Sequence, residues 1–290
     1  MQVKQLFGPG KPLVSFEFFP PATPVGEAAL IKTIDTLRAL GPAFVSVTKT
    51  GNKPPEASVE LAQHIRDLGI VSAAHITAVT ATRDEMARLL DRVVAADIRN
   101  VVALRGDGPK DPSYRPPADG FRYGVDLVRF IRDRGYPLCL LGAGYPEGHV
   151  ECRDRDEDVR HLKEKVDAGL DVVVTQLFYD NADYFSFVDR SRQMGITAPI
   201  VPGIMPITNV PQIERITAMC GAGIPPALRA GLERARDDET AAFEVGVAHA
   251  TDQCIELLQR GAPGIHFYTL NKSPATRAIT ERLQREGLLG

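Results

Sequence analysis

The sequence SFEFFPP at residues 15–21 forms the end of a short apolar run that two prolines stop at once. An apolar run that ends at prolines predicts a short strand, and Glu17 stands near its carboxyl end. A dinucleotide-binding Rossmann sheet would continue with G-x-G-x-x-G after its first strand, and no such fingerprint follows here. This stretch therefore favours a closed barrel over an open dinucleotide-binding sheet.

Outward from this stretch, short apolar runs alternate with amphipathic stretches about every 25 to 40 residues, which is the length of a βα unit. Eight runs are predicted as strands, at 13–18, 44–47, 72–76, 101–104, 138–143, 172–176, 200–203 and 264–267. Helical patterns cover 26–40, 84–96, 123–134, 156–168, 182–194 and 240–260, and glycines 41, 69, 169 and 195 stand where helix C-caps belong. This alternation predicts parallel strands joined by right-handed crossovers, and hence one α/β domain over residues 1–290, a (β/α)8 TIM barrel.

Two longer connections interrupt this pattern. Residues 108–120 contain four prolines and are expected to form a loop after the fourth strand. Residues 221–240 are expected to be an insertion between the seventh and eighth strands. Neither stretch is rich enough in flexible residues to act as a linker, so the chain is not expected to divide there.

The composition is that of an ordinary soluble globular protein, with 44% hydrophobic and 24% charged residues among 290. A net charge of −3 argues against nucleic-acid binding, and no apolar run is long enough to span a membrane. The first residues lack the apolar region of a secretory signal. The four cysteines form no C-x-x-C pair, so we expect free thiols in a cytoplasmic protein.

The predicted strands place polar and glycine positions at one end of the barrel. In TIM barrels the chemistry lies on the loops at the carboxyl ends of the strands. The residues at those positions are Glu17, Thr48, His75, Arg105, Gly106, Asp107, Tyr145, Gln176, Met205 and Tyr268. Their common location predicts a ligand site at this rim.

Glu17 has two interpretations on the sequence alone. Desolvation beside the neighbouring phenylalanines would raise its pKa and make it a proton donor near neutral pH. A strand-end ion pair would explain a glutamate here equally well.

The other rim positions also leave alternatives open. Arg105 and Asp107 suit either a ligand site or an ion pair that stabilises a turn, and His75 resembles a core histidine. The turn at 145–149 holds a tyrosine, a glutamate and a histidine without a second ligand at helical spacing, so no metal is expected. Gln176 could recognise a heterocycle or tie down backbone.

Three polar residues that follow the fifth predicted strand share one face of a helix. Asp158, His161 and Lys165 stand three and four residues apart. This face could bind a phosphate or a ribose, or it could simply be solvated.

Seven segments together resemble the methylenetetrahydrofolate reductase family. They occur in the family's order at 16–21, 44–48, 103–107, 145–149, 175–178, 202–206 and 266–272, so the resemblance covers nearly the whole chain. The chain resembles the short bacterial form, without a C-terminal regulatory domain. The resemblance implies a (β/α)8 barrel that binds FAD and works in one-carbon metabolism and methionine biosynthesis.

The implied reaction is the reduction of 5,10-methylenetetrahydrofolate to 5-methyltetrahydrofolate by NADH or NADPH through FAD, in a ping-pong scheme. By the resemblance, Glu17 is the general acid that protonates the folate N10, and Asp107 is the carboxylate near flavin and pterin. Gln176 contacts folate and nicotinamide, and Tyr268 and Lys272 lie near the substrate. The flavin-contacting positions are Thr48, His75, Arg105, Gly106, Asp107, Tyr123, Tyr145, His149, Asp158 and Lys165. The family also implies a homo-oligomer.

The sequence departs from the family at two places. Lys49 stands where the family usually has an aromatic residue, and Val210 stands where it often has a substrate-stacking phenylalanine or tyrosine.

Three other functions are alternatives to a flavin-dependent reductase. They are a flavin-free reductase with direct hydride transfer, a barrel glycosidase that pairs Glu17 with a second carboxylate, and a non-catalytic folate-binding protein. The choice between NADH and NADPH stays open.

Overall fold

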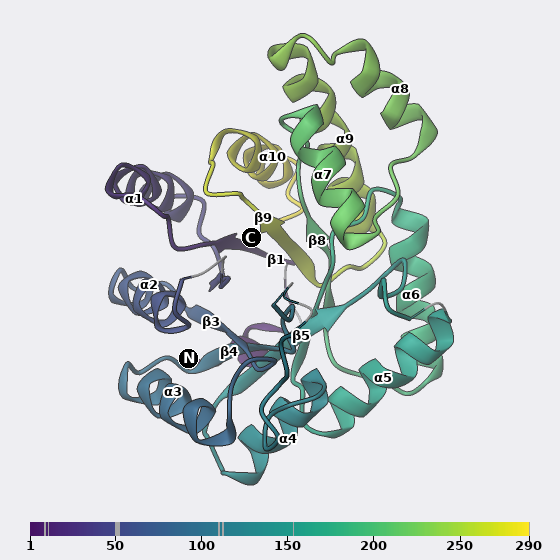
Figure 1. Cartoon of the computed structure of the whole chain (residues 1–290). Coiled ribbons are helices and arrows are strands. Elements are labelled where there is room, and N and C mark those ends of the chain that lie inside the picture. Colours follow the sequence, from purple (N-terminus) through teal and green to yellow (C-terminus); the bar gives the residue numbers. More distant parts are fainter. Residues whose placement is uncertain are drawn as a thin grey trace.

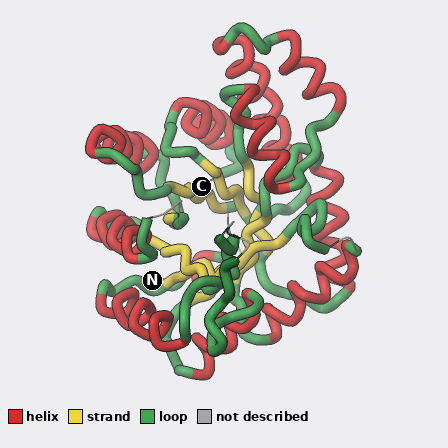
Figure 2. Tube along the Cα trace, in the orientation of Figure 1, coloured by secondary structure: helices red, strands yellow, loops and turns green. Residues whose placement is uncertain are grey.

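The computed structural model describes residues 1–8, 10, 12–49, 53–109, 111, 113–152 and 154–289. Within them, parallel strands form a central sheet and the helices surround it (Figures 1 and 2). The strands are β1 Leu13–Phe18, β2 Phe44–Val47, β3 Ser72–Thr77, β4 Asn100–Leu104, β5 Cys139–Gly144, β6 Val172–Thr175, β7 Ile200–Val201, β8 Gly203–Ile204 and β9 Gly264–Tyr268. The helices are α1 Pro24–Arg38, α2 Glu56–Asp67, α3 Arg83–Ala95, α4 Gly124–Asp133, α5 Arg155–Asp167, α6 Asn181–Gln193, α7 Val210–Cys220, α8 Pro226–Arg234, α9 Glu239–Gln259 and α10 Pro274–Arg285.

The sheet runs in the order β7-β6-β5-β4-β3-β2-β1-β9-β8, and the short segment 200–204 brings its two edges together. Ile200 in β7 pairs with Val173 in β6, whereas Gly203 in β8 pairs with His266 in β9. Pro202 separates these two pairs because it has no N–H to donate, although its carbonyl accepts from the His266 amide at 2.9 Å. The parallel α/β barrel is thus confirmed, and its seventh predicted strand is divided into two.

The helix predictions hold to within two residues at each end. Asp154 starts α5 as an N-cap, since its carboxylate accepts from two amides of the first turn. The four glycines expected at helix ends all have positive φ, between 67° and 111°. The predicted insertion at 221–240 contains α8, which packs beside α7 and α9 at one edge of the barrel (Figure 1).

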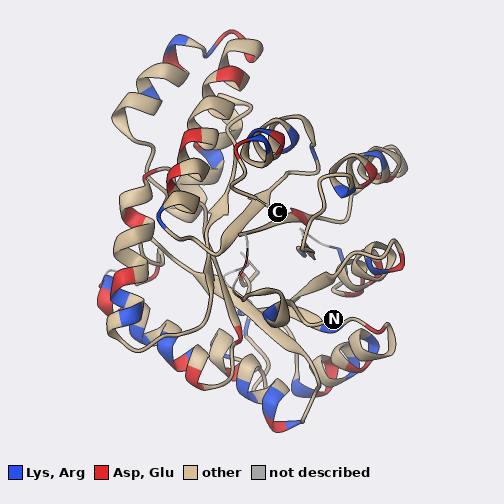
Figure 3. Ribbon diagram, turned by 180° about the vertical axis from the view of Figure 1, so that it is seen from behind, with Lys and Arg blue, Asp and Glu red and all other residues tan. Residues whose placement is uncertain are grey.

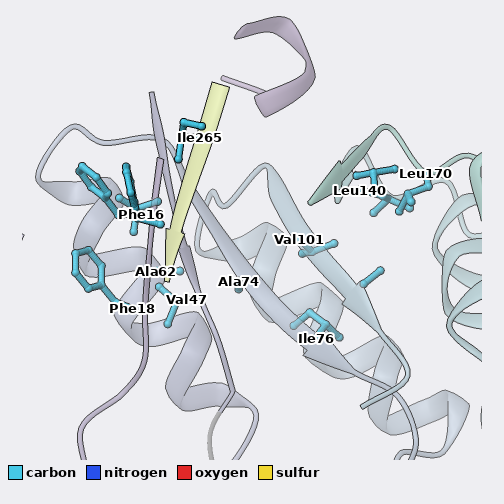
Figure 4. Packing of buried hydrophobic residues seen from close by; sticks show 14 of the residues in the cluster. Phe16, Phe18, Val47, Ala62, Ala74, Ile76, Val101, Leu140, Leu170 and Ile265 are labelled. Carbon is cyan, nitrogen blue, oxygen red and sulfur yellow. The ribbon is translucent and has the colours of Figure 1, made fainter. Parts of the chain in front are cut away.

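Alternation along the strands separates an outer core from the barrel interior. Phe16 and Phe18 project from the same side of β1 and pack in the large cluster that includes Leu30 and Ile34 of α1 (Figure 4). A second cluster of inward-facing residues, including Val3, Phe44 and Val172, fills the interior. Val3 belongs to a 3-10 helix, η1 (Val3–Leu6), and its amide donates to Asn100 Oδ1 at 2.6 Å. Side chains therefore fill the interior around η1, and a large cavity lies toward the carboxyl ends of the strands.

Charged residues follow the outer helices, while the strands carry few of them (Figure 3). In the part of the chain that the structure describes, no helix has both the length and the apolar character that a membrane crossing needs. All four cysteines are free thiols.

Gly203 tests the importance of the closing segment. A Cβ at this position would lie 2.2 Å from the Thr175 carbonyl oxygen and 2.6 Å from the Tyr268 ring. We expect Gly203→Ala to lower the free energy of unfolding by about 1–3 kcal/mol in urea titrations, because neither neighbour can move without disturbing the sheet. Gly8→Ala is the matched control, since open space surrounds Gly8 and its effect should stay within about 0.5 kcal/mol. Equal stability of the two variants would contradict this account of closure.

Candidate active site

A cavity of about 1350 Å³ opens at the carboxyl ends of the strands. This exceeds the roughly 300–1,000 Å³ of typical small-molecule pockets. Its lining includes the predicted rim residues Glu17, Thr48, His75, Arg105, Gly106, Asp107, Tyr145, His149, Gln176, Met205 and Tyr268. Residues far apart in the sequence thus share one cavity.

The Glu17 carboxylate lies between two imidazoles at the inner end of this cavity. Its Oε2 lies 3.2 Å from His75 Nε2 and 3.7 Å from His266 Nε2. The Ser46 hydroxyl, directly across from Glu17 on β2, donates to the same oxygen at 3.3 Å. His266 is also fixed by Ser15, whose hydroxyl lies 2.8 Å from its Nδ1. The carboxylate therefore sits in a polar network.

This surrounding corrects the expectation that neighbouring phenylalanines wall in Glu17 and raise its pKa. Phe16 and Phe18 point to the opposite face of β1, because successive side chains of a strand alternate. Burial does raise the pKa of Glu17, but the charge and hydrogen bonds of His75 and His266 outweigh it and hold that pKa at about 2. In this state Glu17 is a carboxylate paired with imidazoles.

His75 is a cavity residue, although it was also open to interpretation as a core histidine. Its side chain is only 8% exposed and lines the cavity. Within the described residues neither of its ring nitrogens makes a hydrogen bond of good geometry: Nε2 lies 3.2 Å from Glu17 Oε2, and Nδ1 has no partner. A buried ring nitrogen without a partner is costly, so this atom is available to a ligand.

The segment 105–107 differs from a simple turn held by an Arg–Asp pair. Arg105 binds both oxygens of Glu151, at 2.7 and 3.1 Å. Asp107 lines the cavity and takes part in no ion pair within the described residues. Gly106 has φ +79°, and a Cβ there would lie 2.7 Å from Thr77 Cβ. Glycine is thus required for this loop to pass over β3 and present Asp107 to the cavity.

Gln176 and Tyr268 lie side by side across the β6–β9 side of the mouth. Gln176 Oε1 accepts from the Leu177 amide at 2.9 Å, which fixes the side chain at the strand end. The Tyr268 hydroxyl donates to the Thr175 carbonyl at 2.6 Å. The ring of Tyr268 fits here because Gly203 has no side chain.

Four of the expected site residues lie outside this lining. Lys165 is half-buried beside it and donates to the Ala143 carbonyl at 2.9 Å, and burial of its ammonium group lowers its pKa to about 8. Asp158 is buried nearby, and Tyr123 is half exposed at the start of α4. Lys272 lines a second cavity, of about 380 Å³, which shares Tyr268 with the first. The roles assigned to these four stay predictions.

The face that Asp158 and Lys165 share with His161 proves to be mixed. His161 is exposed and lies 4.0 Å from Glu157, so that end of the face is solvated. Asp158 is buried against the barrel, and Lys165 is half-buried there.

The loop between β9 and α10 is strapped to the end of β1. The side chain of Asn271 makes two hydrogen bonds to the Phe19 backbone: its Nδ2 donates to the Phe19 carbonyl at 2.8 Å, and its Oδ1 accepts from the Phe19 N–H at 3.0 Å. Thr269 donates to the Glu17 carbonyl at 2.6 Å. Leu270 and Asn271 both have positive φ, of 50° and 57°, a backbone state that non-glycine residues adopt at a cost. The strap therefore fixes the backbone that carries Glu17.

Sequence reasoning missed Ser46, His266 and Lys53 as lining residues. His266 could have been found, since it precedes Tyr268 by two positions and so shares its face of the strand. Lys49, noted as a departure, lines the cavity. Val210 lines neither cavity, because it starts α7 and is buried in the cluster beneath that helix.

No group of three or more His, Cys, Asp or Glu side chains is arranged to hold a metal ion among the residues described. The arrangement instead offers acid–base chemistry. A carboxylate within reach of two imidazoles can exchange a proton with them and with a ligand in the cavity.

Comparisons with known proteins agree on one family. A family model described as methylenetetrahydrofolate reductase matches residues 2–284. The "5,10-methylenetetrahydrofolate reductase" of Salmonella typhimurium is 36% identical over 93% of this chain and 90% of its own length. The "Methylenetetrahydrofolate reductase (NADH) 1" of Arabidopsis thaliana is 36% identical over 97% of this chain. The chain spans about half the length of the plant and yeast relatives it matches.

One solved structure supports the fold. It is an uncharacterized protein from Clostridium thermocellum that binds two copies of 5-methyl-5,6,7,8-tetrahydrofolic acid. It superposes with a TM-score of 0.66 over 95% of this chain and 96% of its own, at 16% sequence identity. At this identity the likeness concerns the barrel alone.

The low pKa of Glu17 makes the stability of the protein depend on pH. A carboxyl whose pKa falls from 4.5 to about 2 on folding stabilises the native state above pH 4.5, and that stability is lost as the pH falls toward 2. We expect the stability advantage of the parent over Glu17→Gln to shrink by on the order of 2 kcal/mol between about pH 6 and pH 3. Urea unfolding of both proteins measures this difference, and a pH-independent value would show that Glu17 is not held as a carboxylate.

Proposed function

The chain belongs to the methylenetetrahydrofolate reductase family, and we propose that it reduces 5,10-methylenetetrahydrofolate to 5-methyltetrahydrofolate with NADH or NADPH. One observation carries the proposal. A buried carboxylate, Glu17, lies 3.2 Å from one imidazole and 3.7 Å from another at the inner end of a large barrel-mouth cavity. A carboxyl group with two imidazoles nearby can act as a general acid toward a ligand nitrogen.

Glu17 acts as the general acid. Its proton goes to N10 of the folate, the bond between N10 and the bridging methylene carbon breaks, and the electron pair stays on N10. The methylene carbon remains on N5 as an iminium, which accepts a hydride and becomes the methyl group. One proton and one hydride enter for each folate reduced, so the step balances with NADH or NADPH as the reductant.

The proton has a source within the network. Glu17 is ionised beside His75 and His266 in the ligand-free protein, so it must first gain a proton. A folate that fills the cavity displaces water and makes the ionised carboxylate less favourable. Glu17 then takes up a proton, which the imidazoles at 3.2 and 3.7 Å are close enough to relay. Displacement of water by the folate thus takes the part in raising the pKa of Glu17 that the sequence alone assigned to neighbouring phenylalanines.

Asp107 supports the charge that develops on the substrate. Its carboxylate faces the cavity and forms no ion pair within the described residues. A fixed negative charge near a cationic iminium lowers the energy of that state. Gln176 and Tyr268, which line the same cavity at the ends of β6 and β9, orient the folate.

The residues present fit a bound FAD. The cavity is larger than one folate needs. The buried Nδ1 of His75 has no hydrogen-bond partner among the described residues, and a flat cofactor can supply one. Thr48, Arg105, Gly106, Tyr145 and His149 would hold it. When bound, FAD would carry a hydride from NADH or NADPH to the folate.

One observation favours direct hydride transfer as a second candidate. Arg105, which the flavin would need, is already bound by both oxygens of Glu151. The visible spectrum of the purified protein separates the two. A yellow protein that bleaches with NADH under anaerobic conditions carries flavin, and a colourless protein that still oxidises NADH with folate does not.

Glu17→Gln tests the acid assignment. We expect it to keep flavin reduction or NADH binding and to lose folate reduction by about 100-fold or more, because glutamine cannot supply the proton. Stopped-flow measurement of each half-reaction gives both rates. Glu60→Gln is the control, since Glu60 is exposed on α2 and should behave as the parent. Folate reduction by Glu17→Gln at the parent rate would make the assignment wrong.

A further inference from the structure

The second cavity adjoins the first at the side of the barrel mouth. It lies between the segment after β8, the first turns of α9 and the loop that leads from β9 to α10. Tyr268 belongs to the lining of both cavities. Its volume of about 380 Å³ is within the range of small-ligand pockets. Tyr268 is therefore the place where a ligand in the Glu17 cavity comes nearest to this space.

Phe243 of α9 is an aromatic wall of this second cavity. Gly246, one turn further along α9, lets the helix pack directly on the chain after β8, since a Cβ there would lie 1.8 Å from the Ile207 carbonyl oxygen. Residues three apart on a helix share a face. Phe243 is half buried and lines the cavity together with Pro206 and Thr208.

The remaining lining fits a ligand that is aromatic at one point and anionic beyond it. Pro206 and Leu270 add apolar surface beside Phe243, and Lys272 contributes an exposed ammonium group. Glu239 is also present, as an exposed carboxylate at the start of α9. Only one cation and one anion therefore border an otherwise neutral pocket.

Resting on the proposed function, we propose that Phe243 is a specificity-determining residue that packs on the aryl ring of the folate. The pterin lies at Glu17 in the main cavity, the aryl group passes Tyr268 and meets Phe243, and the terminal carboxylate reaches Lys272. Val210 cannot supply this contact, since it is buried beneath α7 and lines neither cavity. The aromatic surface comes from α9 instead.

The test compares ligands with and without the aryl group. Dissociation constants are measured by calorimetry for 5-methyltetrahydrofolate, for 6-methyltetrahydropterin, which has no aryl–glutamate half, and for NADH. The proteins are the parent, Phe243→Leu, Phe243→Tyr and the control Phe185→Leu. Phe185 is a half-buried phenylalanine of α6 that lines neither cavity and packs under Arg260.

We expect Phe243→Leu to weaken 5-methyltetrahydrofolate binding by about threefold to tenfold, the usual contribution of an aromatic contact. The binding of 6-methyltetrahydropterin and of NADH by Phe243→Leu should not differ from that of the parent. Phe243→Tyr should retain folate binding, because it keeps an aromatic ring, and Phe185→Leu should bind all three ligands as the parent does. Leucine keeps most of the volume and hydrophobicity, so folding is preserved, and thermal unfolding of each variant verifies it.

Two results would overturn the inference. Phe243→Leu could bind 5-methyltetrahydrofolate as the parent does, or it could weaken the pterin or NADH by the same factor. Both leave the proposed function standing. Failure of the parent itself to bind 5-methyltetrahydrofolate would instead overturn the proposed function, which is a distinct outcome.

Discussion

The contact between the Glu17 carboxylate and two histidines is the constraint on which the rest of the site depends. A carboxylate that is only 16% exposed needs partners, and His75 and His266 supply them from β3 and β9. Because these strands flank β1 and β2, the three side chains meet only when β1 near the start of the chain pairs with β9 near its end. The acid–base centre is therefore a product of the fold as a whole.

Two backbone devices hold this centre in place. The segment 200–204 joins the edges of the sheet and lets Gly203 make room for the Tyr268 ring. The strap formed by Thr269 and Asn271 fixes the carbonyl of Glu17 and the peptide of Phe19. The strained backbone of Leu270 and Asn271 is the cost of bringing Lys272 and Glu17 to one rim. Position of the acid and extent of the substrate pocket are thus set by the same loop.

The sequence was sufficient for the barrel because its short apolar runs and helical patterns alternate so regularly. It also placed Glu17 at a strand end, since the prolines at 20 and 21 stop the strand. It misjudged the neighbours of Glu17, because residues adjacent in sequence lie on opposite faces of a strand and the true neighbours come from other strands. The wall at Phe243 could not be predicted at all, as it depends on where Gly246 lets α9 pack.

Glu17 is expected to change from a carboxylate to a protonated acid when folate fills the cavity. Infrared difference spectra of the parent minus Glu17→Gln, recorded without ligand and with 5-methyltetrahydrofolate, measure this change. We expect a carboxylate band for Glu17 in the free protein at pH 7 and a protonated carboxyl band in the complex. A carboxylate band in both states would contradict it.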